Sequence, residues 1–71
     1  MKLENVKVGT KVRVKQKQEL GQTPFYTGWL GSVGTIVCTP DEDGNVVVEF
    51  SDGYTDLGHY SNLKRIKEKH S

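Results

Sequence analysis

The stretch GSVGTIVCTPDEDGNVVVEFSDG, residues Gly31 to Gly53, predicts two β-strands joined by a tight acidic turn. Residues 33–38 and 46–50 alternate between two sets of side chains, and this period of two is typical of strands that bury one face more than the other. Pro40 has a fixed φ and Gly44 tolerates a positive φ, so both favour the turn. Asp52 and Gly53 predict a second hairpin turn, which makes a three-stranded meander the centre of the fold.

Two further strands are predicted outside this meander. In residues 11–15, Val12 and Val14 alternate with three cations, and Leu63–Ile66 forms the last strand. Within the meander, residues 54–60 predict the third strand, with Tyr54 and Leu57 packed inward. Residues 61–62 predict a turn of 3₁₀ helix. We therefore expect an all-β fold: a five-stranded, SH3-like small barrel with a long first loop and no substantial helix.

Length and composition indicate a single domain over residues 1–71, with its core in residues 6–66 and a frayed tail at 67–71. The chain is 34% hydrophobic and 27% charged. It has no apolar run near the roughly 20 residues that cross a bilayer, and no apolar segment typical of a secretory signal near its start. We expect a cytoplasmic monomer that makes no contact with membranes.

Charge is distributed very unevenly along the chain. The formal net charge is +1, but residues 2–17 carry +5, residues 18–63 carry −7 without a single Lys or Arg, and residues 64–71 carry +3. The two ends and the middle therefore have opposite signs.

The segment Gln16 to Leu30 has no periodicity and predicts the long first loop. Phe25, Tyr26 and Trp29 lie within five residues there. A loop of this length in so small a domain is usually functional, and a disordered segment is expected to be poor in aromatic residues. We expect Phe25 or Trp29 to point inward and cap the barrel, and Tyr26 to point outward.

The order of these motifs resembles an SH3-like barrel. The motifs are VGTKVRV, the aromatic loop, GSVGTIV, the turn DGN, VVVEF and the closing SNLKRI, which together span residues 6–66. Within that group the spacing of glycines and alternating valines is similar to that of KOW-type domains of transcription and ribosomal proteins, of the Mib/Herc2 type of domain and of the photosystem I subunit PsaE. The acidic, Tyr-rich first loop of SH3 domains proper is missing, so we do not expect recognition of proline-rich peptides.

Catalytic and metal-binding sites are not predicted. His59 has Asp56 and Cys38 as possible partners, but no nucleophile, base and orienting group occur at a spacing that strands would bring together. We expect the His59 ring to be partly exposed at a strand end. The single cysteine, Cys38, is expected to be a buried, small apolar residue. The acidic turn lacks the closing Glu of a calcium loop, and one Cys with two His at no ligand spacing does not suggest zinc. We expect a noncatalytic protein without cofactor, metal or small-molecule substrate.

The basic ends are the strongest functional signal. In an SH3-like barrel the first and last strands pair, which brings together cations that are distant in sequence. The alternative is a solvated edge whose lysines discourage edge-to-edge aggregation. In the functional interpretation, the cationic face contacts phosphates or an acidic protein surface. The candidate binding residues are Lys11, Arg13, Lys15, Lys17, Tyr26, Trp29, Lys64, Arg65 and Lys67.

Two functions follow from this pattern. The first is contact with nucleic acid or with a nucleic-acid machine, which the KOW-like pattern of glycines and valines and the basic ends favour. In this function an exposed aromatic ring beside Arg13 or Lys17 would stack on an unpaired base. Tyr54 and Tyr60 would extend such a platform. The second is a protein interaction module that regulates or assembles a larger, acidic protein, which the near-neutral total charge and the aromatic loop favour.

Overall fold

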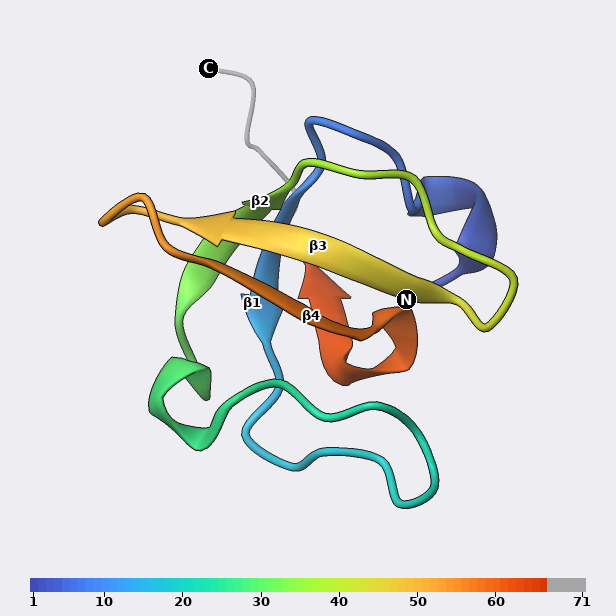
Figure 1. Ribbon diagram of the computed structural model, residues 1–71, viewed down its shortest axis with the longest axis horizontal. Coiled ribbons are helices and arrows are strands. Elements are labelled where there is room, and N and C mark those ends of the chain that lie inside the picture. The colour runs from blue at the N-terminus through green and yellow to red at the C-terminus, as the bar shows by residue number, and fades with distance from the viewer. Residues whose placement is uncertain (67–71) are drawn as a thin grey trace.

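The computed structural model describes residues 1–66 of the chain and contains one five-stranded antiparallel sheet (Figure 1). Three single turns of 3₁₀ helix accompany the sheet: η1 (Leu3–Asn5), η2 (Thr27–Trp29) and η3 (Tyr60–Asn62). The strands are β1 (Lys11–Val14), β2 (Val33–Ile36), β3 (Asn45–Phe50), β4 (Thr55–His59) and β5 (Leu63–Arg65). The all-β class, the long first loop and the 3₁₀ turn before the last strand are confirmed.

The strands are arranged in the order β4-β3-β2-β1-β5. The meander β2-β3-β4 predicted from the sequence is present, and β5 returns to pair with β1, as expected for the first and last strands. In Figure 1, β3 and β4 cross in front of β1 and β5 at a steep angle, which shows how strongly the sheet is bent. The buried side chains of these two parts therefore face each other.

The core consists of apolar side chains from the inward face of the strands and from the first loop. β1 and β3 bury alternate residues, as their period of two predicts. Trp29, Leu30, Tyr60 and Met1 are partly buried and pack against this cluster. The fully or nearly buried members are Val6, Val12, Val14, Phe25, Ile36, Val46, Val48, Phe50 and Leu63.

Two glycines on strands allow neighbouring groups to approach the sheet closely. A Cβ atom at Gly34 would lie 2.5 Å from Val48 Cγ1 and 2.8 Å from the carbonyl oxygen of Glu49. A Cβ atom at Gly58 would lie 2.5 Å from Cε2 of Phe25. Gly58 therefore leaves the space on β4 that the ring of Phe25, from the first loop, fills.

Four orientations expected from the sequence are wrong. Leu57 is 46% exposed because it pairs with Val47 on the outer face, while Tyr54, before β4 begins, is 68% exposed. Cys38 is exposed because β2 ends at Ile36, before the alternation reaches it. The ring of His59 is buried rather than partly exposed, since it stacks on Tyr60 with centroids 4.5 Å apart.

The last strand is one residue shorter than expected and ends at Arg65. The expected frayed tail, residues 67–71, lies outside the described residues. In the described part of the chain, no helix is long and apolar enough to cross a membrane.

Candidate functional site

The centre of the site is the pair formed by Arg13 on β1 and Lys64 on β5. These two residues are directly opposite each other in the antiparallel register, and both side chains are exposed. Residues opposite each other in such a pair project from the same face of the sheet. Fifty residues lie between the two cations in the sequence, and only the pairing of β1 with β5 brings them together.

Four further cations adjoin this pair, and together the six form what we call the basic strip. Lys11 projects from the same face of β1 as Arg13, two residues away. Arg65 pairs with Val12, so its side chain leaves β5 on the opposite side from Lys64. The cations therefore line both sides of the short β5, whereas the sequence suggested one face. The basic strip consists of Lys11, Arg13, Lys15, Lys17, Lys64 and Arg65.

The acidic side chains are largely separated from the basic strip, although Glu19 lies beside Lys15 and Lys17. Among residues 1–66, no ion pair joins Arg13, Lys15, Lys17, Lys64 or Arg65 to an acidic side chain. The carboxylates lie mainly on the turns and strands of the meander, such as Asp41–Asp43 in the turn before β3. The segregation seen along the sequence thus persists in space. Lys67, the remaining predicted cation, lies outside the described residues.

The first loop is held in place by two amide side chains. Asn62, which is fully buried, accepts a hydrogen bond from the backbone N–H of Glu19 (2.6 Å) and donates one to the carbonyl of Thr23 (2.9 Å). Gln18 donates to the carbonyl of Lys15 and accepts from the N–H of Phe25. These bonds fix the segment that carries Lys15 and Lys17 against η3, next to the start of β5.

The aromatic side chains form a small stack at the end of the sheet. Trp29 lies flat on Phe50, with ring centroids 4.1 Å apart and planes inclined by 5°, and its other neighbour is the exposed Tyr54 at 6.4 Å. Arg13 Nη1 donates to the carbonyl of Gly31 (2.9 Å), which follows η2. The guanidinium of Arg13 therefore connects the basic strip with the chain segment that carries Trp29.

Phe25 and Tyr26 have the orientations expected from the sequence: Phe25 is buried and Tyr26 is 69% exposed. The backbone N–H of Tyr26 donates to Asp56 Oδ2 on β4 (2.8 Å). A carboxylate, rather than Arg13 or Lys17, is therefore the charged neighbour of Tyr26. Among residues 1–66, Tyr26 makes no hydrogen bond or ring contact with the paired cations Arg13 and Lys64.

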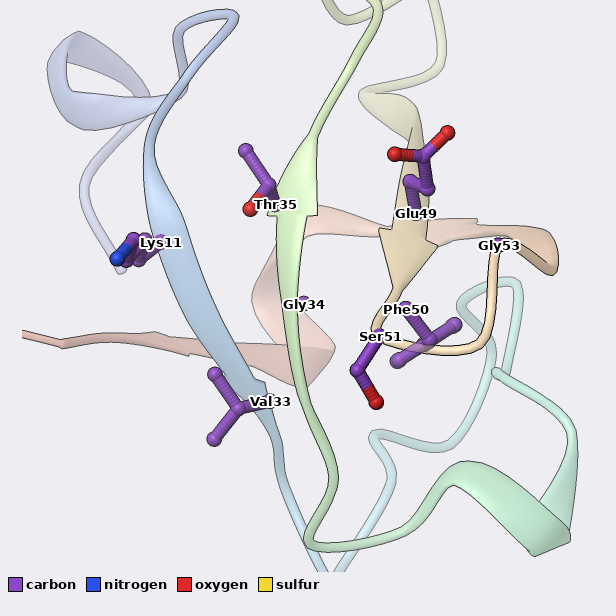
Figure 2. Close-up of a pocket in the computed structure, with 8 residues that line it drawn as sticks. All are labelled: Lys11, Val33, Gly34, Thr35, Glu49, Phe50, Ser51 and Gly53. Atoms are coloured by element: carbon purple, nitrogen blue, oxygen red, sulfur yellow. The ribbon is translucent and has the colours of Figure 1, made fainter.

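A shallow hollow of about 350 Å³ lies on the outer face of β2 (Figure 2). Lys11 and Glu49 flank Thr35 at one end of it, and Val33, Ser51 and Gly53 line the rest. The hollow carries no net charge, because one cation and one carboxylate lie on its opposite sides. It adjoins the basic strip at Lys11 but adds no positive charge to it.

The described part of the chain has no cluster of titratable side chains suited to a metal ion. No group of three or more His, Cys, Asp or Glu side chains within residues 1–66 is placed to hold a metal ion. Nδ1 of His59 accepts a hydrogen bond from the backbone N–H of Ser61 (3.1 Å) and lies 2.8 Å from the Ser61 hydroxyl. His59 thus stabilises the turn η3.

No sequence pattern indicates that Asn62 anchors the loop, because an Asn at a turn is usually explained by the turn itself. Comparison with known proteins adds no identity: the chain matches no protein-family model, no curated protein and no solved structure.

Proposed function

We propose that the protein is a noncatalytic, SH3-like binding module that contacts nucleic acid through the basic strip. The observation that carries this proposal is the cross-strand pair Arg13–Lys64, whose cations have no carboxylate partner among residues 1–66. Cations gathered without counter-charges attract phosphates, and the release of condensed counterions then supplies much of the affinity.

The SH3-like barrel is supported by the strand order and by the bend of the sheet. β1 pairs with both β2 and β5, as the resemblance implies for the first and last strands, and a turn of 3₁₀ helix connects β4 to β5. The close approach of Val48 and Phe50 to Gly34 allows β2 to bend tightly.

Single strands are the favoured ligand because of the aromatic stack. Tyr54 is exposed beside Trp29, and Arg13 donates a hydrogen bond to the carbonyl of Gly31, two residues after Trp29. The aromatic side chains can therefore contact an unpaired base while the neighbouring cations contact a phosphate. The net charge of −7 over residues 18–63 repels a duplex that would wrap around the molecule, so the contact is limited and oriented.

The test is the affinity of fluorescently labelled single-stranded and duplex RNA and DNA, measured by anisotropy at low and at physiological salt. We expect tighter binding of single strands, with a slope of log K against log salt of about −0.7 for each phosphate neutralised. Lys64→Glu should weaken binding and flatten the slope, whereas Lys2→Glu, the same charge change before η1, should do neither. Absence of binding at low salt would refute the proposal.

A second candidate function is binding of an acidic protein surface by the same strip. Leu20, 96% exposed, lies with Lys15, Lys17 and Glu19 around a hollow of about 380 Å³, and an exposed apolar side chain among charges of both signs suits a protein partner better than a phosphate backbone. Recovery of one stoichiometric protein in a pull-down that nuclease does not change would favour this function.

A further inference from the structure

A polar row of three side chains crosses the outer face of β1, β2 and β3. Thr35 on β2 is opposite Lys11 on β1 and opposite Glu49 on β3. Residues opposite each other in an antiparallel sheet project from the same face. Because neighbouring strands are about 4.8 Å apart, the polar row presents an ammonium group, a hydroxyl and a carboxylate across about 10 Å.

A second row lies two residues away along the same strands and on the same face. In it Val33 on β2 is opposite Arg13 on β1, and Arg13 is opposite Lys64 on β5. The hollow shown in Figure 2 lies between the two rows, over the backbone of Gly34. Val33, which is 42% exposed, faces the polar row across Gly34. The hollow therefore has an apolar wall on one side and hydrogen-bonding groups on the other.

The carboxylate of Glu49 is exposed and is not engaged within the described part of the chain. Among residues 1–66 it accepts no hydrogen bond and forms no ion pair, and the hydroxyl of Thr35 likewise makes no hydrogen bond there. A carboxylate accepts two parallel hydrogen bonds when a planar ligand presents two adjacent donors. A flat ligand that lies beside Val33 would thus need two donors at Glu49 and acceptors further along the polar row.

Guanine is the standard base whose polar edge has this pattern. Its N2 amino group and N1–H are adjacent donors, and the acceptors O6 and N7 follow them. With the donors on Glu49, O6 and N7 point toward the hydroxyl of Thr35 and the ammonium of Lys11, which has three N–H donors. Adenine and cytosine present an amino group beside an acceptor, and uracil presents one N–H between two acceptors. Each of these bases would place an acceptor against the carboxylate, which is repulsive.

Given the nucleic-acid binding proposed above, on which this assignment rests, we propose that the hollow is a subsite for one guanine of the bound single strand. The base lies over Gly34, and its Watson–Crick edge faces the polar row. Its sugar then leaves toward the second row, where Arg13 and Lys64 contact the phosphate. Nη1 of Arg13 donates to the carbonyl of Gly31, which fixes the guanidinium and leaves its other N–H groups for the phosphate.

The test measures, by anisotropy at low salt, the binding of labelled oligouridylates that differ only in one central base. We expect central guanine to bind about tenfold more tightly than central adenine, cytosine or uracil, as a good bidentate contact provides. Inosine, which lacks the N2 amino group, should bind with intermediate affinity. Equal affinity of all five strands would overturn the guanine subsite and leave binding by the basic strip in place. Absence of binding by every strand would overturn both.

Glu49→Gln separates recognition of the base from the charge of the chain. It replaces one acceptor oxygen by a donor and removes the repulsion of the other bases. We therefore expect the affinity ratio of guanine to adenine to fall at least about fivefold. Glu42→Gln, the same charge change on the exposed turn before β3, should change the affinities for all strands by the same factor. A ratio that Glu49→Gln leaves unchanged would overturn the proposal.

A free nucleotide carries the same base, so guanosine monophosphate is titrated as a competitor of the guanine strand. We expect half-displacement only at a concentration at least about a hundredfold above the Kd of the strand, because the mononucleotide lacks the neighbouring phosphates that the basic strip contacts. Equal affinity of the mononucleotide and the strand would overturn the assignment to a base within a strand.

Discussion

Val48 lies at the middle of β3, fully buried within the core cluster. Its replacement by Ala removes two methyl groups and leaves a cavity, which so small a core cannot fill by rearrangement. We expect Val48→Ala to lower the free energy of unfolding by about 2 kcal/mol, measured by urea titration.

Val47→Ala is the matched control for this substitution. Val47 is the neighbouring residue on the same strand but is only half-buried, on the outer face. Its substitution should therefore lower the free energy of unfolding by less than Val48→Ala does. Equal effects of the two substitutions would contradict the assigned faces of β3. The fluorescence of Trp29, the one tryptophan of the chain, reports the transition because the ring stacks on Phe50.

Gly58 and Phe25 form a second pair whose packing can be tested at the level of single residues. Gly58→Ala would place a methyl group 2.5 Å from the ring of Phe25, which is itself 2% exposed. We expect a loss of about 1–3 kcal/mol in the free energy of unfolding, because the filled core has no room to yield.

A double-mutant cycle distinguishes this contact from a general effect on β4. In the background of Phe25→Leu, which removes Cε2 and Cζ, two of the three ring atoms nearest the new methyl group, Gly58→Ala should cost less than in the original chain. Additive losses would show that Gly58 is required for a reason other than the ring of Phe25.

At the scale of elements, the first loop depends on Asn62. Asn62→Ala leaves the N–H of Glu19 and the carbonyl of Thr23 without their side-chain partner at a partly buried position, where the Thr23 carbonyl still accepts from the N–H of His59. We expect a loss of about 2 kcal/mol or more in the free energy of unfolding, together with faster hydrogen exchange at the Glu19 amide.

The aspartate variant refines this test. Asn62→Asp keeps an acceptor for Glu19 but no donor for Thr23, so its loss should be at least as large as that of a single missing bond. Gln22→Ala, an exposed position in the same loop, should change neither stability nor exchange. An Asn62→Ala chain with an unchanged urea midpoint would mean that the other contacts of the loop, such as those of Gln18 and Phe25, hold it without Asn62.

At the scale of the whole molecule, the acidic turn should modulate binding at the basic strip through the long-range field. Glu42→Gln with Asp43→Asn removes two exposed charges but keeps Asp41, whose Oδ1 accepts hydrogen bonds from the N–H groups of Asp43 and Asn45. We expect tighter binding of single-stranded nucleic acid at low salt and no change at physiological salt, where charges are screened over about 8 Å. Anisotropy titrations at both salt concentrations check this, and an affinity gain that persists at physiological salt would contradict a long-range origin.

Much of the fold was predictable from local patterns. The period of two in residues 46–50 and the turns at Gly44 and Gly53 determine β3 and its hairpins, because strand alternation and positive φ are properties of a few adjacent residues. The prediction was wrong at Leu57, in the middle of β4, and at Tyr54, Cys38 and His59, which lie at or near strand ends. There a shift of one residue in the assignment reverses the face of a side chain.

By itself the sequence determined the all-β class, the meander and the division of charge between the ends and the middle of the chain, since each follows from neighbouring residues. Tertiary structure alone decided which distant residues meet: Arg13 with Lys64, Asn62 with the loop, Phe25 with Gly58. It also placed Lys11, Thr35 and Glu49 in one row. Such contacts depend on register and on the bend of the sheet, and these are set by the packing of the whole core.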